Sequence, residues 1–277
     1  MVSSYIINKE CTLNEFLESN HLSKSNINKL IECKAISNSN EYLNKDSIIN
    51  IGDEIYINYS LLEENEYELF DKEITVLYED REIIAVEKPR GILIHSDGNT
   101  NETLLNAVCN YLNKQGDDSF VRCLHRIDVD TTGIVLFSKN ILAYNNINYQ
   151  IENLLVNKEY RALVEGEIFE DGDVNLPIGR DRHNSRKYIV CSCGKPAYTK
   201  YQVIERKKGK TLLKVNITTG RTHQIRVHLS HIGHPIIGDS IYGKKGKLKL
   251  HFYKIGFSLY GRYIEIKSKN QIGDWYG

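Results

Sequence analysis

The chain has 277 residues, of which 41% are hydrophobic, and it carries 36 basic and 36 acidic side chains, so its formal net charge is zero. This length favours one large domain with a small appendage. No stretch approaches the roughly 18 uninterrupted apolar residues of a membrane helix, and no secretory signal is visible, so we expect a soluble cytoplasmic protein with no membrane partner.

The first sixty residues have the pattern of a separate unit. Residues 13–17 place their apolar side chains on one helical face, and residues 22–31 predict a second short helix with Ser23 as its N-cap. A turn at Gly52-Asp53 then enters a strand that reaches Ile57. An acidic stretch at residues 63–68 is typical of a linker.

From residue 73 strands alternate with helices, which indicates a mixed α+β core. Strands are expected at residues 74–78, 83–86, 133–137, 159–165, 186–191, 198–206 and 211–218, with a further extended segment at 92–95. Helices are expected at residues 102–113, 141–155 and 223–232.

Charge is unevenly distributed along the chain. Residues 1–80 hold 6 Lys and Arg against 16 Asp and Glu, whereas residues 201–260 hold 12 against 2. A basic segment of this kind suits docking on phosphates, and an ordinary solvated surface explains it equally well.

A dense run of reactive side chains precedes the apolar segment 133–137, and it reads His125-Arg126-Ile127-Asp128-Val129-Asp130-Thr131-Thr132-Gly133. The turn before the strand would lift Asp128 into a cleft while the strand holds it in position. Judged alone, an Asp that caps its own turn is the commoner arrangement. A third interpretation, in which Asp128 and Asp130 bind a divalent ion, rests on only two carboxylates.

A second run, at residues 219–228, predicts a helix with Thr222 as N-cap and Gly233 at its end. Arg226 stands at the edge of the apolar stripe of this helix. An arginine there either reaches solvent or pairs with a carboxylate. Asp128 is the candidate partner, and the ion pair would keep Asp128 an anion, the form needed for nucleophilic attack.

The histidines and cysteines do not predict a metal site. The spacing of the four histidines between residues 223 and 234 matches no standard zinc pattern, and we expect them to bond to backbone or RNA instead. Cys191 and Cys193 are too close for the usual two-residue-spaced zinc pair. We expect thiols here and no disulfide framework.

These motifs resemble those of the RluA-type family of pseudouridine synthases. The central motif of that family reads His-Arg-Leu-Asp, two variable residues, then Thr-Ser-Gly, and this chain has Ile127 for Leu and Thr132 for Ser. Further similar segments follow in the expected order at residues 88–95, 158–166, 194–199, 219–228 and 233–243. The resemblance covers about residues 73–260, and six ordered motifs remove the capping interpretation of Asp128.

The resemblance implies three catalytic residues. Asp128 matches the catalytic aspartate, and Arg226 matches the arginine that pairs with it. Tyr160 matches the tyrosine that stacks on the flipped base and helps to remove the carbon 5 proton. Stacking of a base on an aromatic ring is worth about 1–3 kcal/mol.

Five further residues are expected to bind the substrate. Arg126 matches the arginine that fills the gap left in the RNA, and Ile225 matches an apolar wall of the uracil pocket. His125, Arg221 and His223 belong to the same motifs and complete the set.

The resemblance also implies a domain organisation. Residues 73–277 would form the catalytic domain, α+β with a mixed, mainly antiparallel sheet, after a linker at 63–72. Residues 1–62 resemble the small α-L RNA-binding domain of ribosomal small-subunit proteins. They depart from it in having Ser39-Asn40 in place of the usual Asn-Gly turn and in being acidic, with 5 basic and 8 acidic side chains in residues 1–60.

The expected activity is that of an RNA pseudouridine synthase, an isomerase acting on uridines in structured RNA. Large-subunit ribosomal RNA is the first expected substrate and transfer RNA the second, while DNA is not expected. Uracil leaves its sugar at nitrogen 1 and returns through carbon 5, so no cofactor is required, and the base must be flipped into a pocket. The alternatives are a noncatalytic RNA-binding or ribosome-assembly factor that keeps the fold, and a metal-dependent nuclease or deaminase.

Overall fold

The computed structural model describes residues 2–62, 67–269 and 275, so residues 63–66 of the expected linker lie outside the described residues. The chain divides into two compact units. Unit 1 holds the described residues of 1–85, 95–125 and 136–149, and unit 2 holds those of 86–94, 126–135 and 150–277. Within the described ranges, no helix has the length and apolar character needed to cross a membrane.

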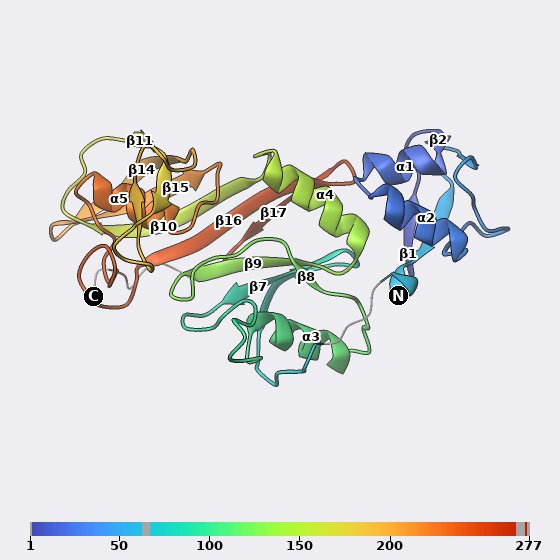
Figure 1. Ribbon diagram of the computed structural model, residues 1–277, viewed down its shortest axis with the longest axis horizontal. Helices are drawn as coiled ribbons and strands as arrows, with labels where there is room; N and C mark the ends of the chain where they lie inside the picture. The colour runs from blue at the N-terminus through green and yellow to red at the C-terminus, as the bar shows by residue number, and fades with distance from the viewer. Residues whose placement is uncertain (1, 63–66, 270–274, 276–277) are drawn as a thin grey trace. The chain divides into compact units, whose positions relative to one another are not determined.

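The N-terminal part of unit 1, blue in Figure 1, contains two short helices and small antiparallel sheets. Helices α1 (Leu13–Ser19) and α2 (Lys24–Glu32) begin where the sequence predicts, because the side chains of Thr12 and Ser23 each accept a backbone N–H of the first turn. Strands β1, β5 and β3 form one sheet and β2 pairs with β4, with the bounds β1 (Val2–Ile6), β2 (Cys11–Thr12), β3 (Ile36–Ser37), β4 (Ile48–Ile49) and β5 (Glu54–Asn58). A single 3-10 turn, η1 (Tyr59–Leu61), follows.

The rest of unit 1 confirms the predicted succession of strands and helices. Its elements are β6 (Thr75–Glu79), the start of β7 (Ile83–Lys88), α3 (Leu104–Lys114), β8 (Arg122–Cys123), the end of β9 (Thr132–Ser138) and most of α4 (Ile141–Glu152). The extended segment expected at residues 92–95 is wrong, since these residues form no strand. Gly91, with φ +82°, turns the chain just before them, and its N–H bonds to the carbonyl of Val129.

Unit 2 is built on an antiparallel sheet in the order β11-β14-β15-β10-β16, with β17 also paired to β16. The long strands β10 and β16 run side by side (Figure 1). Strands β12 and β13 form a separate pair, and helix α5 (Gln224–His231) lies against β13 and β14. The strand bounds are β10 (Asn157–Glu165), β11 (Gly172–Asn175), β12 (Ile178–Arg180), β13 (Tyr188–Val190), β14 (Tyr198–Lys207), β15 (Lys210–Ile217), β16 (Leu250–Leu259) and β17 (Arg262–Lys267).

The fold class is the predicted one, α+β with a mainly antiparallel sheet. A parallel contact joins the start of β9 to β16, through Thr132 and Gly133. Gly133 has φ +117°, and a Cβ there would lie 2.3 Å from the carbonyl oxygen of Phe252. Only glycine can bring the backbone this close, so Gly133 fixes the end of the Asp128 motif against β16.

Helix α5 begins one residue later than predicted. Its N-cap is His223, in the left-handed conformation with φ 56°, and not Thr222. No side chain caps the first turn of α5, and the Gln224 side chain instead accepts the N–H of Arg221, in the turn before the helix, at 3.0 Å. The left-handed residue turns the chain sharply, which directs the His223 ring towards Asp128.

Candidate active site

A pocket in unit 2 collects most of the residues that the sequence singles out. It encloses about 430 Å³ of empty space, open to solvent, and is formed by the Asp128 loop, β10, the turn before α5 and the start of β16. Its lining residues include Arg126, Asp128, Tyr160, Arg221, His223, Ile225 and Arg226.

Asp128 occupies the first position of a tight turn. The N–H of Thr131 bonds back to the carbonyl of Asp128 at 3.0 Å, and Asp is a favoured residue at the first position of such turns. The carboxylate bonds across to helix α5: its Oδ2 accepts a hydrogen bond from Nη1 of Arg226 at 2.8 Å. The ion pair expected from the sequence is therefore present, and the Asp128 side chain remains 25% exposed, towards the pocket.

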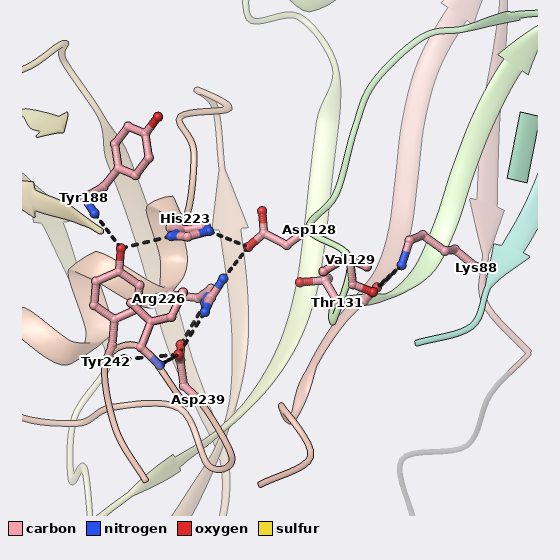
Figure 2. A network of polar contacts seen from close by, with 10 residues as sticks. Lys88, Asp128, Val129, Thr131, Tyr188, His223, Arg226, Asp239 and Tyr242 are labelled. Atoms are coloured by element: carbon pink, nitrogen blue, oxygen red, sulfur yellow. Dashed lines mark hydrogen bonds and ion pairs between the residues drawn. The ribbon is translucent and has the colours of Figure 1, made fainter. Parts of the chain in front are cut away.

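Arg226 is fixed by a second acid, Asp239. Nε and Nη2 of Arg226 donate to the two oxygens of Asp239 at 2.8 and 2.9 Å, and the side chain of Asp239 is 0% exposed. The backbone N–H groups of Ile241 and Tyr242 also bond to Asp239. A two-pronged pair of this kind fixes the guanidinium plane and leaves Nη1 to point at Asp128 (Figure 2).

The charges of this trio support one another. Burial opposes the charge of Arg226, but the hydrogen bonds and charges of Asp239 and then Asp128 outweigh it, so the pKa of Arg226 lies above its ordinary value. Burial also disfavours the Asp239 anion, yet Arg226 and the two backbone N–H groups hold the pKa of Asp239 below its usual range. The guanidinium beside Asp128 is therefore permanently charged.

His223 approaches the same carboxylate oxygen of Asp128 as Arg226 does, with its Nε2 3.8 Å from Oδ2 (Figure 2). Its Nδ1 lies 3.0 Å from the hydroxyl of Tyr242, which also accepts the N–H of Tyr188 at 2.8 Å. Burial lowers the pKa of His223, although the charge of Asp128 acts in the opposite direction. The imidazole is therefore neutral at physiological pH and acts as a polar wall beside the carboxylate.

The loop that carries Asp128 is anchored by Lys88, at the end of β7. Its ammonium group donates to the carbonyls of Val129 at 2.8 Å, Thr131 at 3.0 Å and Pro89 at 3.1 Å, and its side chain is fully buried (Figure 2). Burial lowers the pKa of Lys88 to about 8. The lysine thus binds two carbonyls of the Asp128 turn, those of Val129 and Thr131, and so restricts the movement of Asp128.

Apolar and aromatic side chains form the walls of the pocket. Tyr160, on β10, stacks on Phe252 with ring centroids 4.4 Å apart and planes inclined by 7°. Ile225 and Leu250 are buried beside it. Burial, and then the charge of Asp128, raise the pKa of Tyr160, so its phenol is neutral at physiological pH.

The remaining predicted substrate-binding residues differ in position. Arg126 is exposed at the rim of the pocket, and Arg221 lies there with its Nε bonded to the carbonyl of Pro196 at 3.0 Å. His125 belongs to unit 1, where its Nε2 accepts the N–H of Leu136 at 3.2 Å. The structure thus brings Asp128, Tyr160 and Arg226 together with four of the five substrate-binding candidates.

Metal-binding arrangements are absent from the described part of the chain, in which no three His, Cys, Asp or Glu side chains are grouped to hold an ion. Asp130 is exposed and Asp128 is paired with Arg226, which does not suit a shared divalent ion. His228 lies 2.9 Å from both the hydroxyl of Thr199 and the carbonyl of Leu176, and His234 lies 2.8 Å from the carbonyl of Glu165.

Three residues of the site had no assigned role in the sequence: Lys88, Asp239 and Tyr242. All three belong to segments that the motif comparison singled out, residues 88–95 and 233–243. The sequence could have indicated Asp239, because it is an acid among apolar and glycine residues, after a helix that carries a buried arginine. A buried arginine needs a buried acidic partner, and Asp239 is a candidate.

Residues 82–231 match the protein family described as RNA pseudouridylate synthase. A curated protein of Nitrosomonas europaea, named ribosomal large subunit pseudouridine synthase D, is 41% identical over 172 residues, which cover 62% of this chain and 50% of that protein. Proteins of the same name from Escherichia coli K12 and Pseudomonas aeruginosa are 36% and 35% identical over 193 and 202 residues, covering 69% and 73% of this chain and 59% and 63% of those proteins. The chain thus spans between half and two thirds of the length of the curated relatives it matches.

Among solved structures, the human protein RNA Pseudouridylate Synthase Domain Containing 1 superposes with a TM-score of 0.63. The match covers 76% of this chain and 86% of that one at 23% identity. A second human structure, RNA Pseudouridylate Synthase Domain Containing 4, gives a TM-score of 0.60 at 20% identity, covering 72% of this chain and 89% of that one. These likenesses concern the fold.

Proposed function

The chain belongs to the RNA pseudouridylate synthase family, and on this basis we propose that it isomerises selected uridines in RNA to pseudouridine. Large-subunit ribosomal RNA is the first candidate substrate, because the curated relatives are named for it, and transfer RNA is the second. We propose that the reaction needs no cofactor, that neither DNA nor a membrane is a partner, and that the protein acts in the cytoplasm.

One observation carries the proposal: the carboxylate of Asp128, paired with the permanent cation Arg226, lines one pocket together with the stacked ring of Tyr160. A flipped base needs a pocket closed on its faces by apolar or aromatic side chains, which Tyr160 and Ile225 provide. The ion pair with Arg226 keeps Asp128 ready to attack the nucleotide or to promote departure of its base. Arg126, exposed at the rim, suits the place of the base in the RNA stack.

The reaction balances without a further reactant. The bond between nitrogen 1 of uracil and its sugar breaks, the ring turns, and a bond forms from carbon 5 to the same sugar carbon. Carbon 5 loses a proton and nitrogen 1 gains one, so neither electrons nor phosphate are exchanged. Tyr160 is neutral and buried at the pocket wall. We infer that it holds the base and relays the carbon 5 proton, because its oxygen can accept that proton while its own hydroxyl proton passes on to solvent or to nitrogen 1.

We also propose that residues 1–62 form a small α-L RNA-binding-like domain in front of a catalytic domain at 73–277. The sheet β1-β5-β3 and helices α1 and α2 surround their own buried side chains, among them Leu17, Leu30 and Ile55. This domain would contact RNA less strongly than its basic counterparts, since its net charge is acidic.

Replacing Asp128 by Asn tests the proposal. The amide keeps the shape and a hydrogen bond to Arg226 but loses the nucleophilic charge, so we expect pseudouridine formation to fall at least about 1,000-fold, which is about 4 kcal/mol of activation free energy. RNA affinity should stay within about threefold, because the positive pocket is kept. Transcripts of large-subunit ribosomal RNA and transfer RNA are the substrates, with pseudouridines mapped by carbodiimide-dependent reverse-transcription stops.

Asp130→Asn is the matched control, since Asp130 is exposed two residues away and should lose no activity. Undiminished product from Asp128→Asn would refute the assigned mechanism. Tight RNA binding by the wild type without any pseudouridine in either RNA would instead support a noncatalytic factor. A change in RNA mass would indicate deamination or cleavage, because isomerisation leaves the mass unchanged.

A further inference from the structure

Two thiols lie side by side in the turn that joins β13 to β14. Sγ of Cys191 is 3.1 Å from Sγ of Cys193, both cysteines are free, and Cys193 is exposed while Cys191 is half-buried. Neither belongs to the pocket lining. Formation of a disulfide, in which the sulfurs are about 2.05 Å apart, therefore requires a shift of only about 1 Å.

The turn that carries the thiols is held firmly against β12. The N–H of Cys191 bonds to the carbonyl of Pro177 at 3.1 Å, and the N–H of Gly194 bonds to the carbonyl of Cys191 at 2.9 Å. Gly194 packs so closely that a Cβ there would lie 2.4 Å from the carbonyl carbon of Ile178. Because the backbone on both sides is fixed, the two sulfurs are kept together rather than meeting by chance.

Strand β13 connects this turn to the active site. Three residues before Cys191, the N–H of Tyr188 bonds to the Tyr242 hydroxyl, which in turn lies 3.0 Å from Nδ1 of His223, whose Nε2 faces Asp128 (Figure 2). The rings of Tyr188 and His223 also meet edge to face, with centroids 5.7 Å apart. Val190, Tyr188 and Tyr242 pack on one buried apolar cluster. A displacement of β13 is therefore passed to the groups beside Asp128.

We propose that Cys191 and Cys193 form a reversible disulfide and that its closure lowers the activity of the site by displacing β13 from Tyr242. The first half stands on the geometry of the thiols alone, and the second half rests on the proposed function. Small exposed rings give strained, easily reduced disulfides of the regulatory kind, so the pair stays reduced in a reducing compartment and closes on oxidation.

The chemistry is a thiol–disulfide exchange with a small disulfide such as oxidised glutathione. The Cys193 thiolate attacks one sulfur of the oxidant and expels one glutathione thiolate, which leaves a mixed disulfide on Cys193. The Cys191 sulfur then attacks the Cys193 sulfur and expels the second glutathione. Two protein thiols are oxidised, one disulfide is reduced to two thiols, and the two thiol protons pass to the departing thiolates.

The environment assigns the order of these steps. The hydrogen bond between the two thiols, and then burial, raise the pKa of Cys191, which makes Cys191 the later of the two to react. Cys193 is the exposed member and is reached first by an oxidant.

The test uses the full chain incubated with oxidised glutathione or with dithiothreitol, then alkylated and mapped by peptide mass spectrometry. We expect the oxidised wild type to lose both alkylation sites at Cys191 and Cys193, through a link within one peptide, and to recover them on reduction. Pseudouridine formation should fall about tenfold on oxidation, a coupling of ordinary size, and return with dithiothreitol.

Cys193→Ser should keep full activity in both conditions, and Cys33→Ser, which removes an exposed thiol elsewhere, should respond as the wild type does. Two thiols that remain alkylatable, or a glutathione that stays on Cys193 without closure, would overturn the proposed pair. A disulfide that forms without changing activity would overturn its link to the site. If the reduced wild type makes no pseudouridine at all, the proposed function fails, while the peptide map still decides whether the pair closes.

Discussion

The substitution Asp239→Asn isolates the acid that holds Arg226. The Asp239 side chain has no exposed surface, and its two oxygens accept four hydrogen bonds, two from Arg226 and one each from the N–H groups of Ile241 and Tyr242. Asn offers one oxygen and one NH₂ group. If the oxygen takes the place of Oδ1, which accepts three of the four bonds, the NH₂ group faces Nε of Arg226, and two donors meet.

Removal of one partner of a buried ion pair costs about 3–5 kcal/mol, because the other charge is left buried without compensation. Asn keeps up to three hydrogen bonds and Arg226 keeps Asp128, so we expect the free energy of unfolding to fall by about 3 kcal/mol, the lower end of that range. The guanidinium plane would also lose its fixed orientation, and we expect kcat for pseudouridine formation to fall about 10- to 100-fold.

Urea unfolding at pH 7 measures the loss, with Asp173→Asn as control, since Asp173 is exposed on β11 and should change stability by less than about 0.5 kcal/mol. The folded-state pKa of Asp239 is depressed, so its stabilisation is present above the unfolded value of about 3.9 and is lost as the pH falls through the lower folded value. The difference in free energy of unfolding between wild type and variant should therefore be constant from pH 8 to pH 5 and should decrease below about pH 4. A gap smaller than about 1 kcal/mol at pH 7 would refute the argument that Asp239 holds Arg226.

Three further substitutions test other parts of the site. Lys88→Met leaves the carbonyls of Val129, Thr131 and Pro89 without this donor. It should lower the free energy of unfolding by about 2–4 kcal/mol and reduce kcat, and a variant as stable as the wild type in thermal unfolding would contradict this role. Tyr160→Phe should reduce kcat at least about tenfold with little change in RNA affinity. Because burial raises the pKa of Tyr160, the wild-type rate should be constant between pH 7 and pH 9. A tenfold rise in rate per pH unit would indicate that the phenolate is the active form. Gly133→Ala should lower the free energy of unfolding by more than about 3 kcal/mol or prevent folding, because its Cβ would meet the Phe252 backbone. Gly209→Ala, at a left-handed position with open space around it, should lower it by only about 1–2 kcal/mol. Equal losses of stability in the two variants would contradict the close approach of Gly133 to Phe252.

Local features of the fold could be predicted because their causes are local. Ser23 caps α2 through a hydrogen bond to a residue only three positions along the chain. Strand β10 could be predicted from the apolar residues within its own nine positions. Strands β16 and β17 were not predicted. Strand β16 is buried for most of its length, so its sequence lacks the regular alternation of a half-exposed strand.

The candidate site was accessible from the sequence through residue types in ordered motifs, which named Asp128, Tyr160 and Arg226 and paired the first with the third. The sequence could not show that Arg226 has two partners, since Asp128 lies 98 residues before it and Asp239 lies 13 after it. Nor could it show that the N-cap of α5 is His223 and not Thr222, because the left-handed conformation of His223 goes with its contact to Tyr242, 19 residues further along the chain.

The amino-acid sequence by itself thus determined the class of fold, most of its helices and strands and the residues of the candidate site, because these depend on spacing and on interactions within a few residues. Only the tertiary structure decided which acid fixes the guanidinium, which hydroxyl holds the imidazole and which lysine restrains the catalytic loop. Those choices depend on distances between segments remote in the chain, and such distances exist only once the sheet of unit 2 has brought the segments together.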